Sequence, residues 1–356
     1  MDPGQAPAAV REPGTQRLAA AAPAHRYSPA MPPREDQVEG ITHRVVDVGG
    51  LSMHIAEAGT GPLVLLLHGF PESWYSWRHQ LMALAAAGYH AVAPDQRGYG
   101  RTGGPDDAES YTMLHLVGDV IGLMDALGAE QAVLAGHDWG APVAWNTALL
   151  RPDRIRGVIG LSVPYTPRGS APPVEMLRAL FTDGFYICYF QQPGVADAEL
   201  SRDPRETFRR LLTAASGDGQ AGGVPVVPPG GKFLDLCPEP AELPAWLTER
   251  DIEVFAAEFT ESGFTRPLNW YRSMDLSWEL MAPWQHAILR VPAAYLAGDR
   301  DLAVSFLGGP AVLDNLGSVV PDLRDARLLA GCGHWTQQER PGEVSEAMVS
   351  FLARLG

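Results

Sequence analysis

Short apolar runs and amphipathic stretches follow one another along the first half of the chain. Residues 41–48 (ITHRVVDV) and 51–59 (LSMHIAEAG) alternate polar and apolar positions around Gly49 and Gly50, which predicts a hairpin of two strands. The run 62–67 (PLVLLL) is continuously apolar. Such a run is typical of a strand covered on both faces, so the pattern predicts a parallel sheet at the centre of the fold.

From that run onward, expected strands and helices alternate. The expected helices cover about 78–87, 113–127, 141–150 and 342–355. The further expected strands are 90–95, 132–136, 157–162, 291–298 and 326–331. This order predicts an α/β fold with a mostly parallel, eight-stranded sheet flanked by helices.

The alternation stops after residue 163 and resumes near residue 284. The segment 164–283 has aromatic residues, helical patches and a loop-like stretch, SGDGQAGGVPVVPPGG. We expect it to be a mainly helical lid, inserted between the sixth and seventh strands over the carboxyl edge of the sheet, where ligand crevices form. The predicted core then consists of residues 39–163 and 284–356.

Residues 1–38 are rich in Ala, Pro and Arg, and we expect them to be a disordered extension. A translation start placed too far upstream would look the same. The apolar run near 18–24 is short and interrupted by Pro23, which makes it a poor secretory signal.

The composition excludes several classes of protein. Hydrophobic residues make up 46% of the chain and charged residues 19%, as in globular proteins. A formal net charge of −15 disfavours binding to nucleic acid or to anionic lipid. The three cysteines, Cys188, Cys237 and Cys332, lack CxxC spacing, so they indicate neither a disulfide framework nor a zinc site. We expect a cytoplasmic monomer or homodimer with no membrane span, no cofactor and no metal.

The segment Gly136-His137-Asp138-Trp139-Gly140 lies between an expected strand and an expected helix. This is the context of a nucleophile elbow, in which the central residue attacks the substrate. An aspartate that attacks a saturated carbon leaves an ester that water can cleave, whereas a serine would leave an ether. Asp138 is therefore the candidate nucleophile, and the alternative is a simple helix cap.

His334 is the candidate general base. It lies in the loop after the last expected strand, between Gly331 and Trp335, and imidazole titrates near neutral pH. The acid that orients it should follow the seventh strand. Asp301 is preferred there because it lies farther beyond the strand, but Asp299 is a close alternative that spacing alone does not exclude.

Backbone N–H groups of Phe70 and Trp139 are the candidate oxyanion hole, since they follow a buried strand and the nucleophile respectively. Aromatic residues gather around these motifs and predict an apolar pocket. The candidate pocket residues are His68, Pro71, Trp74, Tyr189 and Trp335.

Six motifs are spread over the chain from about residue 42 to its end: HGFPESWYSWRHQ, PDQRGYG, GHDWGA, YFQQPGVADAEL, LNWYRSMD and GCGHWTQQERPGEV. In these the chain resembles the soluble epoxide hydrolases of the α/β-hydrolase superfamily, in particular the stand-alone enzymes of mycobacteria and their relatives. The resemblance implies Asp138 as nucleophile, His334 as base and Asp301 as its partner. It also implies that two lid tyrosines, Tyr186 and Tyr271, donate hydrogen bonds to the epoxide oxygen. Tyr189 is the closest alternative to Tyr186.

The resemblance implies a small apolar epoxide and water as substrates. A haloalkane dehalogenase would share the fold and the Asp–His chemistry, but it typically has an Asn where this chain has Phe70. A fluoroacetate-type dehalogenase would carry arginines just after the nucleophile, and an ester hydrolase would need a serine at position 138. A non-catalytic binding protein of this fold is a further alternative, which the full set of catalytic candidates disfavours.

Overall fold

The computed structural model describes residue 1 and residues 36–219, 224–306 and 308–356, so most of the predicted N-terminal extension lies outside the described residues. Its centre is one eight-stranded sheet in the order β1-β2-β4-β3-β5-β6-β7-β8. The strands are β1 (Thr42–Val48), β2 (Leu51–Ala58), β3 (Leu63–Leu67), β4 (His90–Pro94), β5 (Ala132–His137), β6 (Ile155–Leu161), β7 (Ala293–Gly298) and β8 (Leu323–Leu329). The β1–β2 and β2–β4 pairs are antiparallel, and every other pair in the sheet is parallel.

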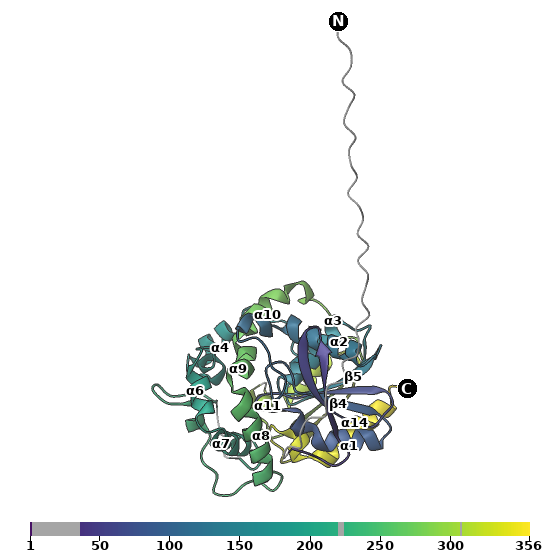
Figure 1. Ribbon diagram of the computed structural model, residues 1–356. Coiled ribbons are helices and arrows are strands. Elements are labelled where there is room, and N and C mark those ends of the chain that lie inside the picture. Colours follow the sequence, from purple (N-terminus) through teal and green to yellow (C-terminus); the bar gives the residue numbers. More distant parts are fainter. Residues whose placement is uncertain (2–35, 220–223, 307) are drawn as a thin grey trace.

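Helices cover both faces of this sheet. In Figure 1, α2 (Met113–Ala126) and α3 (Gly140–Leu150) lie on one side of the strands, and α1 (Arg78–Ala86) and α14 (Pro341–Ala353) lie on the other. Every residue of β3, β5 and β7 is buried, as expected of strands covered on both faces. The predicted fold class is therefore confirmed.

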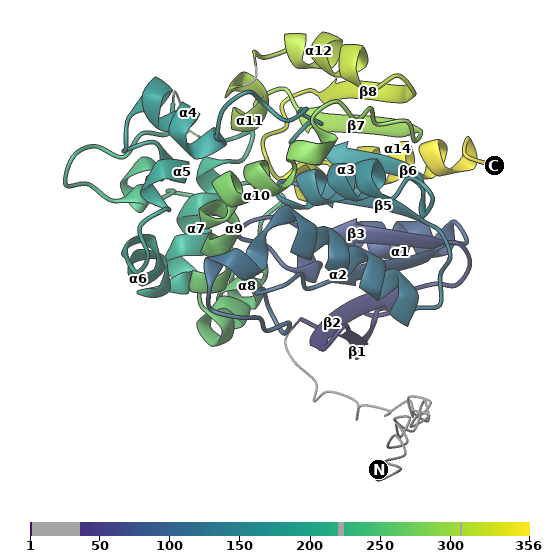
Figure 2. The same ribbon diagram turned by 90° about the horizontal axis from the view of Figure 1, so that it is seen from above.

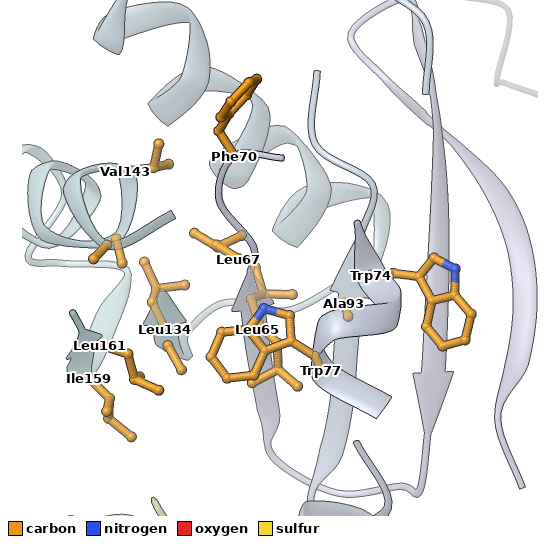
Figure 3. Close-up of a cluster of buried hydrophobic side chains, with 14 of the residues drawn as sticks. Leu65, Leu67, Phe70, Trp74, Trp77, Ala93, Leu134, Val143, Ile159 and Leu161 are labelled. Atoms are coloured by element: carbon orange, nitrogen blue, oxygen red, sulfur yellow. The ribbon is translucent and has the colours of Figure 1, made fainter. Parts of the chain in front are cut away.

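The core is densely filled where β3, β5 and β6 run side by side. Figure 3 shows Leu65, Leu134 and Ile159 from these neighbouring strands, with Trp77 from η1 (Trp74–Trp77) beside them. All four side chains are fully buried. Phe70 lies beyond the end of β3, at the edge of the sheet that also carries Asp138.

A helical lid interrupts the chain between β6 and β7. Figure 2 shows its helices grouped beyond one edge of the sheet. They are α4 (Pro173–Phe181), α5 (Tyr186–Tyr189), α6 (Val195–Ser201), α7 (Pro204–Ala214), α8 (Glu249–Ser262), α9 (Thr265–Arg272) and α10 (Met274–Leu280), with the short 3-10 turns η3 (Phe233–Leu236) and η4 (Ala282–Trp284). The remaining elements outside the lid are η2 (Ala108–Tyr111), α11 (Leu302–Phe306), α12 (Ala311–Val319) and α13 (Thr336–Glu339).

Side-chain caps and aromatic packing hold the lid helices. Asp203 accepts a hydrogen bond from the N–H of Glu206 at the start of α7, and Thr248 caps α8 in the same way. The Phe208 ring of α7 stacks on the Phe255 ring of α8 at 5.4 Å between centroids. These rings belong to the same buried apolar cluster as the sheet, so the lid is packed on the core.

Hydrogen bonds attach α9 and the residue after it to the core, among them the ion pair of Arg266 with Asp106. The indole N–H of Trp270 donates to the carbonyl of Arg97, and the Asn269 amide donates to the carbonyl of Asp106. The Ser273 hydroxyl donates to the carbonyl of Tyr111. In the described part of the chain, no helix combines the length and apolar content needed to cross a bilayer.

Candidate active site

Asp138 lies in a sharp turn between β5 and α3. Its φ is +48°, in the left-handed region that non-glycine residues rarely adopt. Glycine is required on both sides of the turn, because a Cβ at Gly136 would lie 2.1 Å from the carbonyl oxygen of Gly140 and one at Gly140 would lie 2.0 Å from that of Leu67. Because β5, α3 and β3 approach one another so closely, the Asp138 side chain projects beyond the carboxyl end of β5.

One oxygen of the Asp138 carboxylate is held by the backbone. The N–H of Phe70 donates to Oδ1 at 2.7 Å. Gly69 makes this possible, since a Cβ there would come within 2.4 Å of the same oxygen. Within the described residues, the N–H of Trp139, the second predicted donor, makes no hydrogen bond to the Asp138 carboxylate. Phe70 is therefore the oxyanion-hole candidate that the geometry brings to Asp138.

His334 lies between two carboxylates. Its Nε2 is 3.5 Å from Oδ2 of Asp138, and its Nδ1 is 3.2 Å from Oδ1 of Asp301. Asp299, the alternative acid, points elsewhere and accepts the N–H of Gly331 at 2.8 Å. The structure therefore brings Asp138, His334 and Asp301 together and leaves Asp299 outside.

The charges of these three groups support one another. Burial opposes the ionised form of Asp138, but hydrogen bonding and charge from His334, together with His137 and the Phe70 N–H, hold its pKa below the usual value. Burial likewise opposes ionisation of Asp301, and His334 again holds that pKa low. Burial disfavours the charged imidazole, yet the two carboxylates raise the pKa of His334 well above its usual value. These shifts favour an imidazolium between two carboxylates.

Three further polar residues hold the base in place, and no role was predicted for them. The Ser162 Oγ lies 3.0 Å from Nδ1 of His334. The Nε2–H of His137 donates to the carbonyl of His334 at 2.7 Å, and its Nδ1 lies 2.7 Å from Oε2 of Glu72. Glu72 and His137 are fully buried, so this pair connects the nucleophile elbow to the loop of the base through the protein interior.

Glu339 is a further buried carboxylate close to His334. Its Oε2 accepts the N–H of Gly333 at 2.9 Å, and its Oε1 accepts that of Trp335 at 3.1 Å, so it holds the residues on both sides of His334. The same Oε2 accepts the N–H of Gly217, which belongs to the lid, at 2.8 Å. Glu339 therefore fastens a lid loop and the loop of the base to one another.

Glu72, His137 and Glu339 lie within motifs that the sequence already singled out, namely HGFPESW, GHDWG and WTQQERP, whereas Ser162 lies at the end of an expected strand. The available signal was a charged or polar residue next to each catalytic candidate. That signal does not distinguish a buried group from a surface one.

Above Asp138 the core and the lid enclose a cavity of about 450 Å³. Tyr186, at the start of α5, and Tyr271, in α9, both line it together with Asp138. Their ring centroids are 6.2 Å apart. Burial, with the nearby Asp138 charge, raises the pKa of both phenols, so both keep their protons and can donate hydrogen bonds.

The predicted pocket residues do not border this cavity, and each makes a different contact. Nε2 of His68 accepts the N–H of Gln96, and Tyr189 donates its hydroxyl to Glu199 at 2.7 Å. The indole N–H of Trp335 donates to the carbonyl of Leu212, while its ring packs edge-on against that of His334. Pro71 is buried behind Phe70, to which it is joined by a cis peptide bond.

Trp74 also lies away from the pocket that it was expected to line. Figure 3 shows its side chain on the far side of Ala93 from Phe70 and pointing away from it. Its ring packs edge-on against His43 at 4.6 Å between centroids. The observed cavity lining is dominated by other apolar residues: Met113, Leu116, Trp145, Leu149, Tyr165, Ile187, Met274, Trp278, Met281 and Trp284. The pocket is apolar and aromatic as predicted, but most of its residues come from α3, from the loop after β6 and from α10.

Fold and site together define an α/β hydrolase with an aspartate, Asp138, at the sharp turn between β5 and α3. The family model for the alpha/beta hydrolase fold matches residues 62–199. Epoxide hydrolase A of Mycobacterium tuberculosis is 46% identical over 319 residues, covering 88% of this chain and 98% of that protein. Epoxide hydrolase 3 of Siraitia grosvenorii is also 46% identical, over 89% of this chain and 99% of its own length.

Solved structures give the same result. An epoxide hydrolase from an endophytic Streptomyces superimposes with a TM-score of 0.85 at 46% identity, over 89% of this chain and 97% of that one. The chain belongs to the epoxide hydrolase family, and the predicted resemblance to the mycobacterial enzymes is confirmed.

Proposed function

We propose that the protein hydrolyses an epoxide to a vicinal diol through a covalent ester on Asp138. One observation carries the proposal: Asp138 shares an apolar cavity with two phenols, Tyr186 and Tyr271, and its own carboxylate contacts His334. A nucleophile and two proton donors at one cavity, with a base in contact with the nucleophile, are the groups that ring opening and ester hydrolysis require.

In the first step, Oδ2 of Asp138 attacks a ring carbon. Oδ1 is tied to the N–H of Phe70, which leaves Oδ2 as the attacking atom. The carbon–oxygen bond of the ring breaks, and the oxygen takes a proton from Tyr186 or Tyr271. The phenol is needed because an alkoxide is a poor leaving group. The resulting tyrosinate regains a proton from the His334 imidazolium, so the base becomes neutral.

Loss of charge at Asp138 prepares the second step. The ester carries no negative charge, so one of the two groups that raise the pKa of His334 is gone. Neutral His334, oriented by Asp301, takes a proton from a water whose oxygen attacks the ester carbonyl carbon. Negative charge develops on Oδ1, where the N–H of Phe70 stabilises it, and we assign the N–H of Trp139 as a second donor that engages only in this state.

The intermediate then collapses. The bond between the acyl carbon and Oδ2 breaks, Oδ2 takes the proton from His334, and the diol leaves with Oδ2 as one of its two hydroxyl oxygens. Asp138 returns its remaining proton to His334, which restores the starting ion pair. The sum is one epoxide plus one water giving one diol, and no external oxidant or reductant is needed.

The decisive experiment combines product analysis with a trap. The wild-type protein should convert styrene-type or fatty-acid epoxides to diols and release no halide from haloalkanes. His334→Gln keeps the nucleophile and removes the base, so turnover should fall about 10²- to 10⁴-fold. Intact-protein mass spectrometry should then show the variant heavier by the mass of one epoxide. A variant with no adduct, or halide release by the wild type, would overturn the proposal.

The same proposal includes the organisation of the chain. Residues 39–163 and 284–356 act as the catalytic core, and residues 164–283 act as the lid that closes the cavity. We place the protein in the cytoplasm, as a monomer or a homodimer; its three cysteines are buried and free, which suits a reducing compartment. Light scattering of the purified protein tests the oligomeric state.

A further inference from the structure

The cavity has an inner end and a mouth with different properties. Asp138 and buried apolar residues line its inner end. At the other end the lining residues Thr166, Pro167, Gly169 and Ala171 are exposed to solvent, so the loop after β6 forms the mouth. A substrate whose epoxide reaches Asp138 therefore has its opposite end near this loop.

Arg168 lies in the middle of that loop. Among the described residues that line the cavity, Asp138 and Arg168 are the only charged ones, and Arg168 is the only cation. The chain as a whole carries a formal charge of −15, with 42 acidic against 27 basic residues. A cation on the wall of an otherwise apolar cavity is unexpected in such a chain, and it changes which ligands the mouth attracts.

Hydrogen bonds and stacking fix the direction of the Arg168 side chain. Its guanidinium lies over the indole of Trp278, with 3.7 Å from Cζ to the ring centroid. Nε donates to the carbonyl of Trp278 at 2.7 Å, and Nη1 donates to the amide oxygen of Gln285 at 3.0 Å. Both partners are neutral, and Nη2 takes part in neither bond.

Other arginines of the lid differ in this respect. Arg178 pairs with Asp183, and Arg272 pairs with Asp197. Within the described part of the chain, no carboxylate forms an ion pair with Arg168. Neutral groups thus orient the Arg168 guanidinium, and its positive charge remains available to bind an anion at the mouth of the cavity.

We propose that Arg168 is a specificity-determining residue, which binds an anionic group, such as a carboxylate, at the end of the substrate opposite the epoxide. The inference rests on the proposed function and adds the class of substrate: an apolar epoxide that ends in an anion. Arg168 is remote from the reacting atoms, so it binds the ground state and the transition state alike and acts on KM rather than on kcat.

The test compares terminal epoxides of long-chain carboxylates with their methyl esters, over a series of chain lengths. The wild type should prefer the acid by about 10-fold in kcat/KM, because the guanidinium is only partly shielded from water. The preference should come from KM and should shrink as salt is added. Arg168→Gln should remove this preference, so that acid and methyl ester react with similar kcat/KM, and Arg168→Lys should keep part of it.

Arg178→Gln is the matched control, because it removes a lid guanidinium that lies outside the cavity lining and already has a carboxylate partner. This variant should keep the preference for the acid. Equal rates for acid and ester in the wild type, or an undiminished preference in Arg168→Gln, would overturn the role of Arg168 while ester turnover upheld the proposed function. Failure of the wild type to open either epoxide would overturn both. Turnover of the methyl ester by Arg168→Gln shows that the variant is folded.

Discussion

Nε2 of His334 lies 3.5 Å from Oδ2 of Asp138, so the nucleophile and the base of the proposed reaction are ion-paired before substrate arrives. The contact stabilises Asp138 as a carboxylate and His334 as an imidazolium at the same time. The imidazolium suits the first step, in which it returns a proton to the tyrosinate, but not the second, because a protonated imidazole cannot take a proton from water. Esterification removes the negative charge of Asp138, so the pKa of His334 falls and the imidazole can take a proton from water in the second step.

Replacing Asp138 by Asn imitates the ester, since the side chain keeps its shape and loses its charge. The folded-state pKa of His334 should then fall, because one of the two carboxylates that raise it is gone. The remaining charge of Asp301 should keep the shift partial. Nitrogen NMR of the labelled imidazole measures the titration directly. Asp299→Asn is the control and should leave the pKa unchanged, since Asp299 accepts the N–H of Gly331 instead. An unaltered titration in Asp138→Asn would contradict the coupling.

Tyr186→Phe and Tyr271→Phe should each slow ester formation about 10²-fold, because each removes a donor to the oxygen that leaves the carbon. Rapid-quench measurement of ester formation on the His334→Gln background separates this step from hydrolysis. Tyr189→Phe is the matched control, since its hydroxyl donates to Glu199 and does not face the cavity. That change should cost about 1 kcal/mol in the free energy of unfolding and leave the rate of ester formation close to that of the parent. Equal effects at all three positions would mean that the phenols have no specific role.

Gly69→Ala should displace the nucleophile without unfolding the protein. The added Cβ would lie 2.3 Å from Cβ of Asp138, so the carboxylate must move away from the Phe70 N–H. A displacement of about 1 Å costs on the order of 10²-fold in rate. Gly118→Ala, at an exposed position in α2 with no atom within 4 Å of the new Cβ, is the control, and it should raise stability by about 0.5–1 kcal/mol at unchanged activity. A fully active Gly69→Ala protein would show that the close approach of Gly69 is dispensable.

Glu339→Ala should affect both stability and the second chemical step. The change deprives the N–H groups of Gly217, Gly333 and Trp335 of their acceptor, which should lower the free energy of unfolding by about 3 kcal/mol. The loop of His334 loses support, so the ester should accumulate during turnover. Glu343→Ala, whose exposed carboxylate lies 3.7 Å from Arg340, should change stability by less than about 0.5 kcal/mol. Chemical denaturation measures the first effect, and the second would be refuted by a steady state free of ester.

Most of the fold follows from the pattern of apolar residues. Runs such as 62–67 are buried on both faces whatever the details of packing, and the observed bounds of β3, α2 and α14 lie within about two residues of the predicted ones. The elbow was predictable for a related reason, because glycine is required where β5, α3 and β3 touch, and that requirement is visible as GHDWG.

The cavity wall and the buried polar network could not be predicted in the same way. Tyr186 and Tyr189 lie in one short helix, and only the packing of α5 decides which hydroxyl enters the cavity and which meets Glu199. Trp74 is close to the motifs in sequence, yet η1 directs it toward His43. Glu72 meets His137 across 65 residues of sequence and Glu339 meets Gly217 across 122 residues, and no local pattern encodes these contacts.

The most direct test of the ester is the fate of the water oxygen in a single turnover. Protein in molar excess over the epoxide reacts in water enriched in oxygen-18. Mass spectrometry then measures the masses of the diol and of the peptide that contains Asp138. Attack of water on the acyl carbon predicts that the heavy oxygen enters the Asp138 carboxylate and that the first diol contains none, because its new oxygen came from Oδ2. Heavy oxygen in the first diol with an unlabelled peptide would mean that water attacks the epoxide itself, and the covalent mechanism would be wrong.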